Sequence, residues 1–181
     1  MKYLFRDLKA EEIDVRVATV NENGVSLLLY KDARVDQDIL DETVGPMNWQ
    51  RLHTRDNANC IVEIWDKDKG QWIKKEDTGV ESNTQKEKGL ASDSFKRACV
   101  NWGIGRELYT APFIWISKDK VNLYDTKRKD KNLKTVYSTN DKFHVEKIEI
   151  TNKVITGLAI KNQNNKRVFL YAPISEQKGE K

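Results

Sequence analysis

The stretch Thr84-Gln-Lys-Glu-Lys-Gly-Leu-Ala-Ser-Asp-Ser-Phe-Lys-Arg-Ala-Cys-Val-Asn-Trp-Gly103 has the residue spacing of one amphipathic helix. At about 100° per residue, one side of this helix collects five apolar residues: Ala91, Phe95, Ala98, Cys99 and Trp102. Lys86, Lys96 and Arg97 fall on roughly the opposite side. Gly103 ends the helix, because glycine readily adopts the left-handed conformation that follows a helix C-terminus. The stretch therefore predicts a helix with one apolar side and one basic side.

The composition is that of a polar, mildly basic chain. Its 181 residues are 38% hydrophobic and 33% charged, where about a quarter is usual, and the mean hydropathy is −0.73. A net charge of +4 permits an anionic partner without requiring one. The length suffices for a single domain over 1–173, which we expect to be followed by a disordered tail at 174–181.

Neither a membrane segment nor a secretory signal is indicated. No run approaches the roughly 18 apolar residues of a membrane span, and Met1-Lys-Tyr-Leu-Phe-Arg-Asp7 lacks a signal-peptide apolar region. We therefore expect a cytoplasmic protein without a membrane partner. Cys60 and Cys99 show no pairing pattern, so we expect both to be buried, reduced thiols.

A second helix is predicted over 33–44. Asp32 can cap its first turn, and Gly45-Pro46 ends it. Apolar residues recur inside it at helical spacing: Val35, Ile39, Leu40 and Val44. Arg34 points away from this apolar side, where the packing of a core does not require it.

Three candidate strands lie between the two helices. They span 49–54, 60–65 and 72–77, and the polar turn at 66–70 joins the second strand to the third. The order helix, three-stranded antiparallel meander, helix predicts an α+β fold, with both helices on one face of the sheet.

The flanking segments predict further β-structure. A hairpin is expected around Asn21-Glu-Asn-Gly24, and later strands at 143–150, 154–160 and 167–171 form a C-terminal hairpin region over 141–172. We expect 108–116 to be extended. The stretch 117–134 holds seven Lys/Arg against three Asp. It is interpreted as a disordered loop or an outer DNA contact, with the loop preferred.

Signals for catalysis are weak. His53 and His144 have no cysteine or carboxylate at metal-ligand spacing, and the chain lacks the P-loop and nucleophile-elbow motifs. Glu63 and Asp56 could begin a metal nuclease site, but Trp65 stands where a lysine would support it. We therefore expect a non-hydrolytic protein with no metal and no cofactor.

Binding is the better-supported role. Arg34, Lys86, Lys96 and Arg97 all lie opposite the apolar sides of two helices that should pack on one sheet. Such cations can neutralise phosphates and release counterions, and aromatic side chains can stack on bases. Candidate aromatic platforms are Trp49, Trp65, Trp72, Tyr109 and Trp115.

Two blocks carry a resemblance to a known family. Residues 30–49 run from Tyr30 to Trp49 through a helix with an arginine and then a glycine. Residues 85–106 start with lysines and continue to Lys96-Arg97-Ala98 and Trp102-Gly103. The blocks resemble the two signatures of the Rad-fifty-two family of single-strand annealing proteins, including its bacteriophage branch. The resemblance covers about residues 30–116.

The resemblance implies an ATP-independent protein that forms oligomeric rings and anneals complementary DNA strands in recombination and repair. It places Arg34, Lys96 and Arg97 in an inner groove that holds single-stranded DNA. Val100 stands where the eukaryotic member has a further basic residue. A single-strand-binding protein or an exonuclease would be a further partner, and a phage origin would mean the cytoplasm of the bacterial host.

Two alternatives remain open at this point. The helix–three strands–helix order is also similar to that of double-stranded RNA-binding domains, which read the shape of a duplex. A metal-dependent nuclease built around Glu63 is the other alternative.

Overall fold

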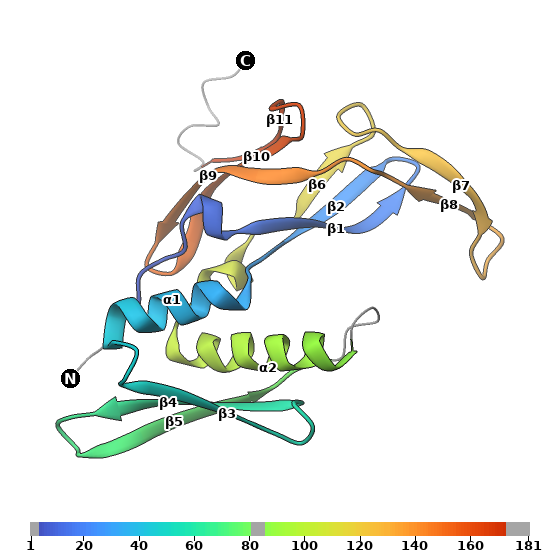
Figure 1. The fold of residues 1–181 in the computed structure, drawn as a ribbon. Coiled ribbons are helices and arrows are strands. Elements are labelled where there is room, and N and C mark those ends of the chain that lie inside the picture. The colour runs from blue at the N-terminus through green and yellow to red at the C-terminus, as the bar shows by residue number, and fades with distance from the viewer. Residues whose placement is uncertain (1–3, 81–85, 173–181) are drawn as a thin grey trace. The chain divides into compact units, whose positions relative to one another are not determined.

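The computed structural model describes residues 4–80 and 86–172, except for the side chains of 86–88 (Figure 1). The tail at 174–181, predicted to be disordered, lies outside these residues. Contacts group the chain into two compact units, where the sequence predicted one domain over 1–173 with its core at 30–116. Unit 1 comprises Met1–Asp7 and Lys31–Arg106, and unit 2 comprises Leu8–Tyr30 and Glu107–Lys181. The mixed α+β class is confirmed by α-helices combined with mostly antiparallel strands.

Unit 1 contains two helices and a three-stranded sheet among its described residues. Its elements are α1 (Ala33–Val44), β3 (Trp49–Thr54), β4 (Asn59–Asp66), β5 (Gln71–Thr78) and α2 (Lys86–Trp102). The Asp32 carboxylate accepts a hydrogen bond from the backbone N–H of Arg34 and so caps α1, as the sequence predicted. The sheet order is β3-β4-β5, with antiparallel neighbours. The predicted bounds agree with α1 and β3 and fall one residue short at each end of β4 and β5.

Helix α2 covers one face of this sheet, and α1 packs on α2 (Figure 1). Alternate residues of β4 face α2 and are buried: Cys60, Val62 and Ile64. They meet Phe95, Ala98 and Cys99 of α2, which are also fully buried. The sequence placed both helices directly on the sheet, whereas α1 meets it mainly at β3.

The chain enters α2 through a close approach at Gly79. A Cβ added to Gly79 would lie 2.7 Å from the backbone N of Ser94 and 2.9 Å from the carbonyl oxygen of Leu90. The Gly79 N–H donates to the carbonyl of Ala58 at 2.7 Å. A side chain at this position would therefore push the end of β5 away from α2.

Unit 2 is built on a six-stranded sheet of order β11-β10-β9-β1-β2-β6. The strands are β1 (Asp14–Asn21), β2 (Gly24–Tyr30), β6 (Ile114–Ser117), β9 (Phe143–Thr151), β10 (Val154–Asn162) and β11 (Arg167–Tyr171). The N-terminal and C-terminal hairpins, predicted as separate additions, are thus parts of one sheet. They meet where Asp14 of β1 pairs with His144 of β9.

A separate two-stranded ribbon follows β6. It consists of β7 (Tyr124–Lys129) and β8 (Thr135–Ser138) and extends away from the six-stranded sheet (Figure 1). The preference for a disordered loop at 117–134 was therefore wrong. The reason is local: the Thr126 hydroxyl donates to the carbonyl of Val136 at 2.7 Å, and the Asp130 carboxylate accepts from backbone N–H groups of the turn.

The segment before β6 also differs from its prediction. Instead of an extended start at 108, the 3₁₀ helix η2 (Arg106–Thr110) precedes β6. The buried Glu107 carboxylate fixes this turn by accepting from the backbone N–H of Leu8 at 2.8 Å, just before the short helix η1 (Ala10–Glu12). The Thr110 hydroxyl oxygen accepts from the N–H of Ile155 at 2.9 Å. Capping and anchoring contacts, which apolar patterns do not report, decide this local structure.

Candidate nucleic-acid interface

Arg34 occupies the exposed side of α1. It is the second residue of the helix, and its side chain is exposed. Within the part of the chain that the structure describes, its guanidinium has no ion pair. The exposure of Arg34 agrees with the prediction that its side chain points away from the apolar side of α1.

Lys96 and Arg97 are half-buried on α2, where the sequence predicted a solvated back. Helix α1 packs on α2 and covers part of the surface around Lys96 that the helical wheel assigned to solvent. Nε of Arg97 pairs with Oδ2 of Asp93 at 3.0 Å, one helical turn earlier, and Asp93 also accepts from the N–H of Val80. Lys86 lies at the first position of α2, and its side chain is outside the described residues.

A buried ion pair joins Lys31, which precedes α1, to Asp36 in the first turn of α1. Nζ of Lys31 lies 2.5 Å from both carboxylate oxygens of Asp36, and the two side chains are 4% and 0% exposed. Burial raises the pKa of Asp36 from 3.8 to about 6, although the charges of Lys31 and Lys96 oppose this rise. Gly105 makes room for the pair, since a Cβ there would lie 2.1 Å from the Lys31 side chain.

The positions of the predicted cations on α1 and α2 show that they do not form one compact cluster. The charge of Lys96 acts to lower the pKa of Asp36, so Lys96 lies near that carboxyl group. Arg34 precedes Asp36 by two residues, a turn of about 200° around α1, and so lies almost opposite it. Lys96 and Arg97 are neighbours on α2, whereas Arg34 lies on the side of α1 opposite to Asp36.

Several other cations of unit 1 have structural roles. The ammonium of Lys75 donates to the carbonyl of Asn101 at 2.7 Å, and Nη2 of Arg106 donates to that of Val100 at 2.9 Å. These carbonyls end α2, where positive charge compensates the helix dipole. The guanidinium of Arg51 lies 4.6 Å from the ring centroid of Phe95. Sequence patterns give no signal for these roles, because each depends on a partner brought close by folding.

The candidate aromatic platforms have different surroundings. Trp49 stacks on buried Phe95 with ring centroids 6.1 Å apart, and its indole N–H donates to the Asp41 carboxylate. Trp65 and Trp72 form an edge-on pair on the sheet face that points away from α2, with Trp72 36% exposed. In unit 2, Tyr109 is exposed, and Trp115 stacks against an exposed phenylalanine. Trp72 and Tyr109 are therefore the accessible rings among these five.

The side chains that could support catalysis either pair with other residues or lie apart from one another. Glu63 accepts a hydrogen bond from the Gln50 side chain and pairs with Lys74 at 3.8 Å. Burial, followed by the charge of Arg51, lowers the pKa of His53. Across residues 4–80 and 86–172, no three His, Cys, Asp or Glu side chains are grouped to hold a metal ion. Both cysteines are free and buried, as expected, and burial raises the pKa of Cys60 to about 11.

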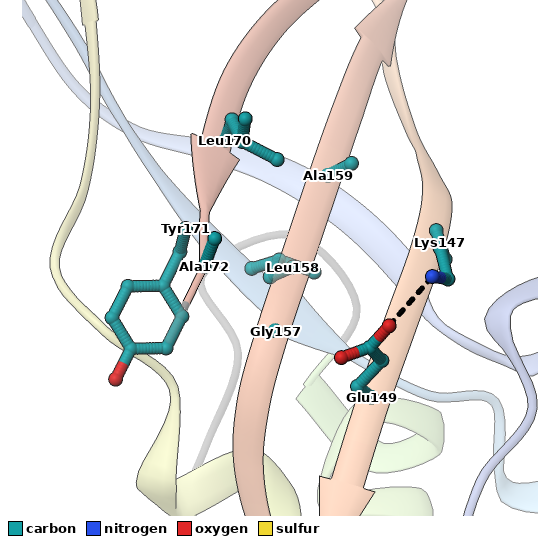
Figure 2. Close-up of a pocket in the computed structure, with 8 residues that line it drawn as sticks. All are labelled: Lys147, Glu149, Gly157, Leu158, Ala159, Leu170, Tyr171 and Ala172. Carbon is teal, nitrogen blue, oxygen red and sulfur yellow. Dashed lines mark hydrogen bonds and ion pairs between the residues drawn. The ribbon is translucent and has the colours of Figure 1, made fainter. Parts of the chain in front are cut away.

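A shallow depression on the β9–β10–β11 ladder is too small for a ligand of ordinary size. Its volume is about 70 Å³, against roughly 300–1,000 Å³ for typical ligand pockets. Figure 2 shows the ion pair of Lys147 and Glu149 on one side, 2.6 Å long, and Tyr171 pointing away on the other. The depression is open beside Glu149 because residue 157 is a glycine. A Cβ at Gly157 would lie 3.1 Å from a carboxylate oxygen of Glu149.

Comparisons of the chain with protein families, with curated proteins and with solved structures gave no match. Neither helix in the described ranges has the length and apolar character needed to cross a bilayer.

Proposed function

We propose that the protein binds single-stranded DNA without sequence preference and anneals complementary strands without ATP, as the resemblance to the Rad-fifty-two family implies. The observation that carries the proposal is the position of the resembling blocks. The block at 30–49 contains α1, the block at 85–106 contains α2, and these helices pack together in unit 1. The cations that the resemblance assigns to DNA remain at least partly accessible.

The chemistry required is the positioning of phosphates rather than bond cleavage. Lys96 and Arg97 offer adjacent charges on α2, and Arg34 adds an exposed guanidinium on α1. Contacts to phosphates leave the base edges free, which strand annealing demands. The other cations of this region, Lys31, Lys75 and Arg106, are occupied by a carboxylate or by helix carbonyls. Arg97 is likewise paired with Asp93, and Lys75 and Arg106 are exposed, so the choice of Lys96 and Arg97 rests on the resemblance.

The oligomer belongs to the same proposal. A net charge of +4 per chain gives each protomer a weak site. Linking many such sites along one strand raises the overall affinity by the effective-concentration effect. We propose a homo-oligomeric ring on this ground.

The test is the variant Lys96→Ala/Arg97→Ala, measured by fluorescence anisotropy with labelled oligo-dT at several salt concentrations. Removing two phosphate contacts should weaken binding about tenfold or more and lower the slope of log affinity against log salt by about 1.4. The melting temperature and the oligomer size should stay nearly unchanged. Annealing of complementary oligonucleotides should fall in parallel, with the same rate in the presence and absence of ATP.

The matched control is Lys67→Ala/Lys69→Ala, which removes two exposed charges from the β4–β5 turn of the same unit. Its affinity should stay within about twofold of the unmodified protein. Equal losses in both variants, or no loss in the first, would refute the assignment of the site. A clear preference for duplex RNA over oligo-dT would favour the double-stranded RNA alternative instead.

A further inference from the structure

The ribbon of β7, β8 and their turn, residues 124–138, carries a concentrated positive charge. It contains five cations, Lys127, Arg128, Lys129, Lys131 and Lys134, against the two acids Asp125 and Asp130. Every residue from 127 to 134 is exposed, whereas β8 is half-buried because it lies beside β1. The ribbon therefore presents β7 and the turn, with a net charge of +3, to solvent.

Both acids of this ribbon are engaged in shaping it. The Asp130 carboxylate accepts from the backbone N–H groups of Asn132 at 2.8 Å and Lys134 at 2.9 Å, and so closes the turn. The Asp125 carboxylate accepts from the N–H of Lys127 at 2.7 Å and lies 3.9 Å from its ammonium group. These contacts hold the two negative charges close to the backbone.

Three of the cations have no side-chain partner within the part of the chain that the structure describes. Lys129 donates to the Thr135 hydroxyl at 2.7 Å. Among the described residues, Arg128, Lys131 and Lys134 have neither an ion pair nor a side-chain hydrogen bond. A hollow of about 620 Å³ separates the ribbon from the β1–β2 turn, and Glu22 of that turn lies on its wall. Lys134 lines this hollow together with Glu22, whereas Arg128 and Lys131 lie outside it and do not face that acid.

We propose that this ribbon binds double-stranded DNA, with Arg128, Lys131 and Lys134 on the phosphates that border a groove. Two neighbouring strands are about 4.8 Å apart, and the major groove of DNA, about 12 Å wide, admits a two-stranded ribbon. Lysine and arginine contacts to phosphates carry no base information, so the binding is independent of sequence. Duplex RNA is a poorer ligand, because its major groove is too narrow to enter.

This inference goes beyond the proposed single-strand site and does not depend on it. The ribbon belongs to unit 2, and the helices with Lys96 and Arg97 belong to unit 1. Loss of either activity can therefore be observed while the other persists.

The experiment uses the full chain with Arg128→Ala/Lys131→Ala/Lys134→Ala and a labelled DNA duplex of about 25 base pairs. Affinity for the duplex should fall at least tenfold, and the salt slope should decrease by about 2.7, because three phosphate contacts are lost. Affinity for oligo-dT should stay within about twofold. The unmodified protein should prefer the DNA duplex to an RNA duplex of the same sequence.

The matched control is Lys9→Ala/Lys142→Ala/Lys166→Ala, which removes the same charge from exposed positions elsewhere in unit 2. It should keep its duplex affinity. An equal loss of duplex affinity in both triple variants would show that only net charge matters and would overturn the proposal. An unchanged duplex affinity in the ribbon variant would also overturn it. Equal affinity of the unmodified protein for DNA and RNA duplexes would overturn the groove mode.

Two further measurements complete the test. Lys131→Glu, a single change in the exposed turn, should also weaken duplex binding and should leave the melting temperature unchanged; retained affinity would contradict the proposal. Vesicles with about a third phosphatidylserine serve as a different anionic surface. If the ribbon variant lost vesicle binding and kept duplex binding, the ribbon would be a membrane contact and not a DNA contact.

Discussion

Asp36 is an acidic residue that the fold buries completely among the apolar residues of α1. A carboxylate without any exposure is stabilised by the nearby ammonium of Lys31, yet burial still raises its pKa to about 6. Desolvation of two ions can exceed the attraction between them. The helical wheel places Asp36 beside the apolar residues of α1, but only the contact with Lys31 explains why an acid is tolerated there.

The first prediction concerns pH. The folded-state pKa of Asp36, about 6, lies above the ordinary value of 3.8. The folded protein therefore holds an extra proton between about pH 4 and pH 6, and stability should decrease as pH rises through this window. The loss should be at most about 3 kcal/mol and should end near pH 7. Urea unfolding at pH 4 to 8 measures it, with Lys31→Met/Asp36→Leu as the reference.

The unfolding free energy of the unmodified protein minus that of the reference should fall by up to about 3 kcal/mol across this range. Parallel curves would show that Asp36 does not titrate there. The single change Asp36→Ala should cost about 3–5 kcal/mol near neutral pH, more than the double change, because it leaves the buried Lys31 without its partner.

At the scale of elements, local signals were sufficient for many of the bounds. The Asp32 cap and the glycine after Val44 define α1, and alternating apolar residues define β4, because these signals act within a few residues. The same reasoning missed the β7–β8 ribbon. β7 is rich in basic residues and lacks apolar alternation, β8 is only four residues long, and the turn between them depends on hydrogen bonds to Asp130.

The sequence predicted the candidate site only in part, because the exposure of its side chains depends on how the helices pack. A helical wheel assumes one buried side, but α2 has the sheet on one side and α1 on another, so Lys96 is half-buried. The roles of Lys75 and Arg106 at the end of α2 depend on residues that are distant in sequence or at a turn. Pattern and propensity specify elements, whereas accessibility depends on how the elements pack.

The second prediction tests the packing of α2 on its sheet. Phe95 has no exposed surface, stacks on Trp49 and lies beneath the guanidinium of Arg51. Phe95→Ala should lower the free energy of unfolding by about 3–5 kcal/mol, since it removes a large buried ring and leaves a cavity. Chemical denaturation followed by circular dichroism provides the measurement.

Leu52→Ala is the control for this change. Leu52 is 58% exposed on β3, so its loss should cost about 0.5 kcal/mol or less. Similar costs for the two variants would mean that Phe95 does not anchor α2.

At the scale of the whole molecule, the chain crosses between its units three times. Unit 1 takes its main segment from Lys31–Arg106, and unit 2 is assembled from the segments before and after it. The cations assigned to single-stranded DNA lie in unit 1, and the ribbon assigned to duplex DNA lies in unit 2, so the two sites can be altered separately.

The third prediction is the oligomeric state. If many weak sites act together on one strand, the protein should elute as a large oligomer, and its affinity for oligo-dT should rise with oligonucleotide length until several protomers are engaged. Size-exclusion chromatography with light scattering gives the mass, and titration with oligonucleotides of increasing length gives the affinities. A monomer that does not bind oligo-dT at low salt would exclude both the ring and the annealing function.

The pairing of Asp14 with His144 has a consequence for how the chain is made. Strands β1 and β2 leave the ribosome early, whereas β9 follows only after all of unit 1. At roughly 5–20 residues per second, the wait lasts on the order of ten seconds. During that time the edge of β1 has no β9 to pair with, and Val25 and Leu27, buried in the finished protein, lack their later neighbours. Nascent chains are therefore most in need of a chaperone after unit 1 is complete and before the C-terminal strands emerge.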